Sequence, residues 1–303
     1  MENMMVKFTD ALVSQIVKNG IDRDCIRVQE VTKNNAQKHM AVCIKKSKET
    51  PIAHVMYTDG YLRDWESGKM TIDDIAKEFI KKSMDAYDQV NGGVEMSREV
   101  ILDNAFLQIA GAEANAWMIL DRGVPFKNVL DMVLFVRVRL TINGTLGSCI
   151  VTKEMLRNYD ITESELFSAA KQNTIGKYIC VPVEQLMASI AGQIDDYQID
   201  ENAKSELGDH GLYVATNKDK WYGASVLAFP ELLQKYAERL GGSVYIMPSS
   251  IHEVMVIKKT PDMDPDDLRG MVKEINHSQV MPEEILTDNL YEYDIDKKEL
   301  RVA

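Results

Sequence analysis

A polar segment between two apolar runs near the C-terminus carries the residue types of a hydrolytic site. Ser249 or Ser250 could act as a nucleophile and His252 as its base, with Glu253 or Asp209 orienting the histidine. The segment lacks the GxSxG elbow that presents a nucleophile, and a serine-rich connection between strands is usually only a turn. The candidate catalytic residues are Ser250, His252, Glu253, Asp209 and His210.

Three of the five histidines fall in the last hundred residues, at His210, His252 and His277. Imidazole together with carboxylate suits zinc or iron, which makes these three the candidate metal ligands. Their spacing matches no HExxH motif, and histidines on separate elements need not meet. We therefore expect no metal and no cofactor. His277 is predicted instead to end a helix, where a cation complements the C-terminal dipole.

Two other motifs resemble known sites and are rejected on their spacing. The acidic run from Asp262 imitates the start of a calcium loop, which needs glycine at its sixth position and glutamate at its twelfth. Asp267 and Lys273 stand at those positions. The run Asn143–Gly147 lacks the lysine and the following helix of a phosphate loop.

Trp221 and Tyr222, which follow Lys218 and Lys220, have the composition of a surface that stacks on nucleotide bases. Because they are predicted to lie in a strand of an acidic region, packing in the core or at a sheet edge is the favoured interpretation.

Hairpins and helices alternate along the first half of the chain. An amphipathic helix ends near Gly20, and a hairpin follows in which Val28 faces Val42 and Ile26 faces Ile44, with a loop at Asn34, Asn35 and Ala36. The remaining predicted elements are a strand over 51–57, a helix capped by Thr71 with Asp74, a helix or helical pair over 98–120, and a hairpin at Asn143-Gly144. In that hairpin Val136, Val138 and Leu140 should be buried, and Arg137 and Arg139 exposed.

The second half continues with short helices and then strands. Helices are predicted over 152–158, over 162–174 with Thr162 as the cap, and after Pro182. The acidic stretch 195–209 is the candidate exposed connector. The last elements are strands over 212–216 and 221–227, a helix from Pro230, strands over 244–247 and 252–258, a helix over 265–277, and a hairpin that turns at Asp296, Lys297 and Lys298. This order predicts an α+β fold of antiparallel sheets with helices packed on one face. Two subdomains, 1–125 and 126–303, would divide the chain.

The composition is that of a globular and acidic protein. The 303 residues include 35 basic and 47 acidic side chains, for a net charge of −12. That charge disfavours binding to nucleic acid or to anionic lipid, although Lys33, Lys38, Lys45, Lys46 and Lys48 cluster around the first hairpin. The four cysteines show no CxxC spacing, the N-terminus does not read as a signal peptide, and no apolar run reaches the ~20 residues of a membrane span. A cytoplasmic location is expected.

Several blocks of the sequence resemble one family. The strings TNKDKWYGASVLAFPELLQKYAERLGGSVYIMPSSIHEVMVI and MVKEINHSQVMPEEILTDNLYEYD are similar to the hallmark blocks of an uncharacterised family of Gram-positive anaerobic bacteria, number 5688 in a series of domains of unknown function. VTKNNAQKHMAVCI and LGSCIVTKEMLRNYDITESELFSAAKQNT are similar to it as well. The resemblance implies a cytoplasmic bacterial protein and transfers no catalytic residue.

The expected function is that of a non-catalytic interaction protein that binds a protein partner or forms a homo-oligomer. The alternative is a metal-dependent or serine hydrolase centred on Ser249, Ser250, His252 and Glu253. Whether His210, His252 and Glu253 converge in a pocket distinguishes the two hypotheses.

Overall fold

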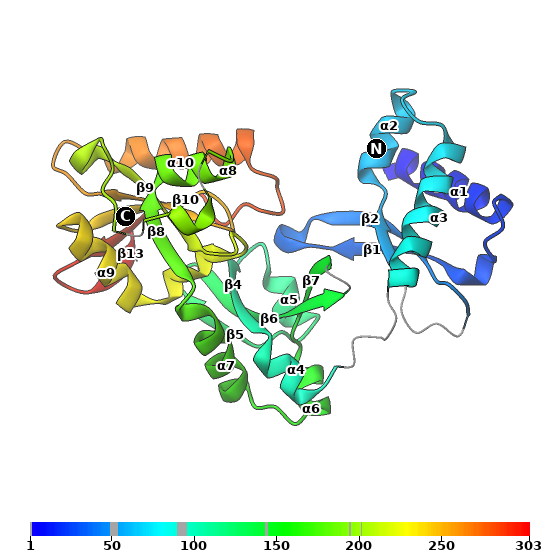
Figure 1. Cartoon of the computed structure of the whole chain (residues 1–303), viewed down its shortest axis with the longest axis horizontal. Coiled ribbons are helices and arrows are strands. Elements are labelled where there is room, and N and C mark those ends of the chain that lie inside the picture. Colours follow the sequence, from blue (N-terminus) through cyan, green and yellow to red (C-terminus); the bar gives the residue numbers. More distant parts are fainter. Residues whose placement is uncertain (1, 49–53, 90–95, 143–144, 194, 201) are drawn as a thin grey trace. The chain divides into compact units, whose positions relative to one another are not determined.

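The computed structural model describes residues 2–48, 54–89, 96–142, 145–193, 195–200 and 202–303. Its contacts divide the chain into two compact units (Figure 1). Unit 1 comprises residues 1–95 and 141–147, and unit 2 comprises residues 96–140 and 148–303. The predicted boundary at 125 is therefore replaced by one at 95. The reason is that a strand within residues 96–125 pairs inside a sheet of unit 2.

Unit 1 packs helices on one three-stranded antiparallel sheet. The sheet has the order β1 (Ile26–Thr32), β2 (Lys38–Ile44), β3 (His54–Tyr57), and the helices are α1 (Glu2–Lys18), α2 (Asp59–Glu66) and α3 (Ile72–Gln89). The predicted register is confirmed, with Val28 opposite Val42 and Ile26 opposite Ile44. Asn35 and Ala36 in the loop have positive φ angles of 57° and 54°. The core of the unit is formed by side chains from α1, α3 and the sheet, among them Phe8, Leu12, Ile16, Val42, Ile44, Ile75 and Phe79.

Unit 2 contains two antiparallel sheets, except for residues 141–142 of β6 and 145–147 of β7, which are assigned to unit 1. The smaller has the order β4 (Ala105–Gly111), β6 (Met132–Ile142), β5 (Phe126–Val129), and β7 (Thr145–Ile150) also pairs with β6. The larger has the order β13 (Glu299–Val302), β12 (Tyr291–Asp294), β10 (Val244–Pro248), β11 (Val254–Lys258), β9 (Leu212–Asn217), β8 (Tyr178–Pro182). The helices are α4 (Arg98–Asp103), α5 (Ala116–Leu120), α6 (Lys153–Asn158), α7 (Glu163–Ile175), α8 (Val183–Ile190), α9 (Pro230–Leu240) and α10 (Pro265–Gln279). The α+β class with antiparallel sheets is confirmed.

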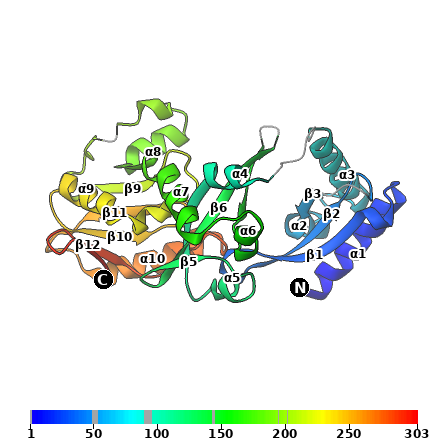
Figure 2. The same ribbon diagram turned by 90° about the horizontal axis from the view of Figure 1, so that it is seen from below.

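One large core joins the two sheets of unit 2. Leu107 and Val136 of the smaller sheet belong to the same apolar cluster as Val254 and Tyr293 of the larger sheet, and α7 and α9 add Leu166 and Leu233 to it. Along β8 and β9, every second side chain points into this core, and the side chains between them point to the opposite face of the larger sheet. Ile179, Val181 and Val214 pack against Leu186 of α8, so α8 and α9 lie on opposite faces of the larger sheet (Figures 1 and 2). The expectation that the helices pack on one face is therefore wrong for this sheet, because both of its faces carry buried apolar side chains.

Local capping explains several helix starts. Thr71 and Asp74, and likewise Thr162 and Glu165, exchange side-chain and backbone hydrogen bonds as capping boxes. Asp264 accepts from the N–H of Asp266, with Pro265 as the first helical residue. This capping role accounts for the acidic run that imitates a calcium loop.

Three predictions of local structure were wrong. Residues 105–111 form strand β4 rather than helix, because the apolar run AFLQIAG is buried on both faces and its periodicity does not separate the two. Residues 221–227 are not a strand: a tight loop leads into a 3-10 helix, η5 (Gly223–Ala228). Arg137 and Arg139 are half-buried rather than exposed, and Leu140 of the same strand is half-buried rather than buried. The turn at Asn143-Gly144 lies outside the described residues, although β6 and β7 on either side pair as expected.

The stretch 195–209 holds two short 3-10 helices, η3 (Asp196–Gln198) and η4 (Gly208–His210). Within it Ser205 is buried, and its N–H donates to the hydroxyl of Tyr213 on β9 over 2.9 Å. This part of the predicted connector is therefore docked on the larger sheet. No helix in the described part of the chain is long and apolar enough to cross a membrane.

Candidate functional site

The serine-containing segment forms the connection between β10 and β11. Pro248 pairs with Val254 across the two strands, and the N–H of Ser250 donates to the carbonyl of Glu253. The Ser250 hydroxyl accepts from the backbone N–H of His252 over 3.0 Å, and the Ser249 hydroxyl donates to Glu253 over 3.4 Å. Ser250 is buried. The serines thus have turn-forming contacts, and the described hydrogen bonds of the His252 ring do not include either hydroxyl.

The His252 ring is held in one orientation. Its Nδ1 accepts from the backbone N–H of Tyr222 over 3.1 Å, so the neutral ring carries its proton on Nε2. That Nε2 lies 3.6 Å from Oε1 of Glu284. Burial lowers the pKa of His252 from its ordinary 6.5, and the carboxylates of Glu284 and Glu253 only partly oppose this. The ring is therefore neutral at pH 7 and acts as an acceptor for the loop that precedes η5.

The other predicted site residues lie elsewhere. His210 precedes β9, whose Leu212 pairs with Ile257, whereas His252 precedes Val254, which pairs with Ala215. The two histidines therefore flank opposite ends of the strand pair, roughly 20 Å apart at 3.3 Å per residue. Asp209 is in η4, and its side chain lies outside what the structure describes.

His277 is at the exposed C-terminal end of α10. Its Nδ1 lies 2.7 Å from the carbonyl of Lys273, and its Nε2 lies 3.8 Å from Asp288. Across the described residues no group of three or more His, Cys, Asp or Glu side chains could hold a metal ion. The structure brings Ser250, His252 and Glu253 into one turn and leaves His210 and His277 outside it.

The loop whose Tyr222 N–H donates to His252 is tightly folded. Lys220 and Tyr222 have positive φ angles of 53° and 58°, which L residues adopt only at a cost in free energy. At Gly223 a Cβ atom would meet Thr216 Oγ1, and it would lie 2.6 Å from the Asn217 nitrogen and 2.7 Å from the His252 carbonyl oxygen. Asn217 closes the loop from both sides, because its side chain donates to the carbonyl of Trp221 and accepts from the N–H of Trp221.

This loop presents a cluster of aromatic rings. Trp221 and Tyr222 are half-exposed and lie 4.8 Å apart, and Phe106 of β4 lies 5.5 Å from Trp221 and 5.8 Å from Tyr222. The ring of His252 lies 5.2 Å from that of Tyr222. The four rings form one cluster, in which Phe106 is buried and the other three rings are partly exposed; it is here called the aromatic surface.

Two arginines of β6 lie against the aromatic surface. The guanidinium of Arg137 lies 5.2 Å from the Tyr222 ring, and that of Arg139 lies 5.5 Å from Phe106 and 5.7 Å from Trp221. Both are placed by hydrogen bonds: Arg137 donates to Ser148 and to Gln108, and Arg139 donates to Asp219 over 2.7 Å. These contacts are in the range of cation–π attraction.

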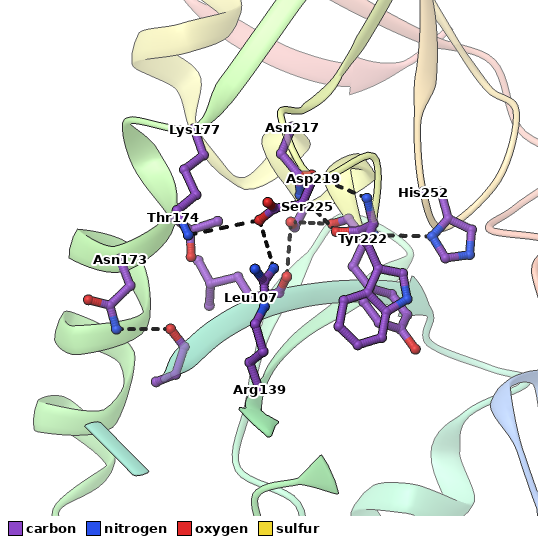
Figure 3. A network of polar contacts seen from close by, with 12 residues as sticks. Leu107, Arg139, Asn173, Thr174, Lys177, Asn217, Asp219, Tyr222, Ser225 and His252 are labelled. Atoms are coloured by element: carbon purple, nitrogen blue, oxygen red, sulfur yellow. Dashed lines mark hydrogen bonds and ion pairs between the residues drawn. The ribbon is translucent and has the colours of Figure 1, made fainter. Parts of the chain in front are cut away.

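A polar network beneath the loop ties the two sheets together (Figure 3). Asp219 accepts from Arg139 of β6 and lies 3.9 Å from Lys177, which precedes β8. The buried hydroxyl of Ser225 lies 2.8 Å from the carbonyl of Tyr222, 3.1 Å from the carbonyl of Leu107 on β4, and 2.7 Å from the hydroxyl of Tyr178 on β8. Burial raises the pKa of Tyr178 well above its usual range, so it stays a neutral hydrogen-bonding group. The loop is thus rigidly supported from both sheets.

The sequence contained one signal for this surface and lacked the rest. Trp221 and Tyr222 after two lysines indicated a stacking surface, but the favoured interpretation placed them in a strand. Phe106, Arg137 and Arg139 lie about a hundred residues away along the chain. The pairing of β4 with β6 places Phe106 beside Arg137, and the packing of the two sheets around one core brings them to the loop.

The fold and the site define a two-unit α+β protein with a supported aromatic and arginine-bearing surface on its second unit. The chain belongs to the family of unknown function DUF5688, whose model matches residues 5–295. The match covers nearly the whole chain and confirms the resemblance found in its sequence blocks. No curated protein and no solved structure matches the chain.

Proposed function

We propose that this protein is a non-catalytic cytoplasmic binding protein whose second unit recognises a protein partner through the aromatic surface. The observation that carries the proposal is the half-exposed pair Trp221 and Tyr222, held by a strained loop and flanked by Arg137 and Arg139. Tryptophan, tyrosine and arginine dominate the binding energy of protein interfaces. Positive φ angles at non-glycine residues persist where the surrounding structure enforces them, and such sites are frequently functional.

A different protein is favoured over a second copy of the chain. The net charge of −12 opposes self-association by like-charge repulsion. The hydrogen bonds and ring contacts of the loop also lower the entropy cost of binding, because they restrict its side chains before a partner arrives.

The hydrolase alternative receives no support from the described contacts. A nucleophilic serine needs its hydroxyl within reach of a basic ring nitrogen. Nδ1 of His252 is occupied by the N–H of Tyr222, and Nε2 faces Glu284. The cytoplasmic location rests on the four free cysteines, since thiols persist in a reducing compartment.

Site-specific photo-crosslinking in cells tests the proposal. A photoreactive amino acid at exposed Lys218, three residues before Trp221, should crosslink one defined protein, whereas the same group at exposed Met271 on α10 should not. An untagged wild-type chain should compete with the crosslink, and Trp221→Ala should abolish it. This comparison requires that the Trp221→Ala chain have the same melting temperature as the wild type.

Three results would contradict the proposal. One is the same crosslinks from Lys218 as from Met271. Another is a crosslink to a second copy of the chain, together with a dimer in sedimentation. The third is hydrolytic turnover that His252→Asn removes while folding is retained.

A further inference from the structure

A small basic pocket lies in unit 2 near the end of β11 that is remote from His252. Its volume is about 200 Å³, and three of its lining side chains are cationic: Lys204, Arg239 and Lys258. Among the described residues that line it, none is acidic. In a chain of net charge −12, a concave site with this composition is unusual and calls for an anion.

The pocket wall is built by a loop that needs two glycines. Gly208 has a φ of 60°, and a Cβ on Gly211 would overlap the side chain of Ser205 and lie 3.0 Å from the carbonyl of Gly208. The Ser205 N–H is bound to the Tyr213 hydroxyl, which fixes this loop on β9. The wall is therefore formed without a ligand, and glycine stands where the backbone approaches neighbouring atoms most closely.

The cations come from different elements and are separately held. Arg239, near the C-terminal end of α9, donates to the carbonyl of Cys180 over 2.7 Å and lies 5.4 Å from the Tyr213 ring. Lys258 is the last residue of β11, and the end of its side chain lies near Gly241 and Gly242. One carboxylate touches the lining, because the Ser205 hydroxyl donates to Glu184 over 2.8 Å. Three of the residues that line the pocket are thus cationic, and this lining favours an anionic ligand.

We propose that this pocket binds the phosphate group of a small molecule. Phosphate is nearly dianionic near neutral pH, and an arginine with two lysines is a common recognition set for it. The volume exceeds what a single phosphate ion needs, since a water molecule takes about 30 Å³, and it is smaller than sites for drug-sized ligands. A phosphate monoester with a short body of a few atoms therefore fits better than a nucleotide.

Calorimetric and NMR titrations of the full chain test this site. Inorganic phosphate and glycerol 3-phosphate are added at constant ionic strength, with acetate as the matched anion control. We expect dissociation constants of about 1 mM or below, with the amide signals of Gly208 and Gly211 shifting along the titration. Tighter binding of the ester identifies a phosphorylated metabolite as the ligand class, whereas equal binding shows that the site recognises the phosphate alone.

Charge-removing variants locate the binding. Lys258→Gln and Lys204→Gln should each weaken binding by about tenfold or more, because each removes one charge-assisted contact. Lys235→Gln, an exposed lysine of α9 that does not line the pocket, should leave binding unchanged. The proposal is overturned if folded wild-type protein binds neither phosphate ligand, or if Lys258→Gln and Lys204→Gln bind both as wild type does. It is also overturned if the shifted amides lie away from the loop 204–211.

Discussion

The backbone N–H of Tyr222 donates to Nδ1 of His252 across 3.1 Å, and this bond links the turn between β10 and β11 to the loop that presents the aromatic surface. A residue singled out for catalysis thus has a supporting role. Because a backbone N–H can only donate, the bond requires His252 to be unprotonated at Nδ1. The same bond makes the aromatic surface sensitive to the protonation of one histidine.

Replacing His252 should destabilise the protein according to the acceptor that remains. His252→Leu leaves the N–H of Tyr222 unsatisfied and should lower the free energy of unfolding by about 1 to 3 kcal/mol. His252→Asn keeps an oxygen near the position of Nδ1 and should cost less, through loss of the ring contact with Tyr222 alone. Urea denaturation at pH 7 measures both. Equal stability of His252→Leu and wild type would show that the bond contributes nothing.

The same histidine predicts a pH dependence. The pKa of His252 is lowered by burial from 6.5, so the unfolded chain takes up this proton at a higher pH than the folded chain does. The free energy of unfolding should therefore fall as the pH drops below about 7, and should stop falling from this cause below the folded pKa. His252→Asn should flatten this part of the curve. Melting temperatures measured from about pH 7.5 to pH 5 for both proteins provide the test, and parallel curves would contradict it.

Two glycine-to-alanine changes should act in opposite directions. Gly223→Ala forces a methyl group against the backbone of Asn217 and His252 and should destabilise unit 2 by about 3 kcal/mol or more. Gly270→Ala, on the exposed face of α10 where the Cβ meets no atom within 4 Å, should stabilise it by up to about 1 kcal/mol. Thermal and urea unfolding compare the two. A tolerated Gly223→Ala would mean that the loop is looser than described.

The capping box of α7 should make an acid-sensitive contribution. Hydrogen bonds from the backbone and side chain of Thr162, and then from Arg98, lower the pKa of Glu165 from 4.5 to about 2. A lowered folded pKa gives stability that is present above pH 4.5 and is lost as the pH falls from there towards 2. Glu165→Gln should thus be less stable than wild type at pH 7, and this difference should shrink in acid. Urea denaturation of Glu165→Gln and of the wild type at pH 7 and at about pH 3 measures this difference, and a difference that does not change with pH would contradict the prediction.

Duplex DNA should not bind with useful affinity at physiological salt. The chain is strongly acidic, and the lysine cluster of the first hairpin is partly neutralised, since Lys38 pairs with Glu30 and Lys48 pairs with Asp22 and Asp24. Fluorescence anisotropy with a labelled duplex is the measurement. Sub-micromolar, salt-sensitive binding that disappears in a Lys45→Gln, Lys46→Gln double variant would contradict this expectation.

The sequence by itself determined the features that depend on neighbouring residues. The first hairpin and its register, the capped starts of α3 and α7, the helix that begins at Pro230 and ends before Gly241, and the α+β class all follow from short-range patterns. Each is set by side-chain alternation, by a side chain bonding to the nearest free N–H groups, or by glycine and proline geometry. These interactions join residues that are a few positions apart, so they can be predicted from a single sequence.

Only the tertiary structure decided the candidate site. The sequence grouped His210, His252 and His277 because they are close along the chain, whereas strand pairing separates His210 from His252 and joins His252 to Tyr222. Strand β4 was missed because a segment buried on both faces has no periodicity that distinguishes it from a helix. The contact of Phe106 and Arg139 with Trp221 depends on the packing of two sheets around one core, and that packing is a property of the folded chain as a whole.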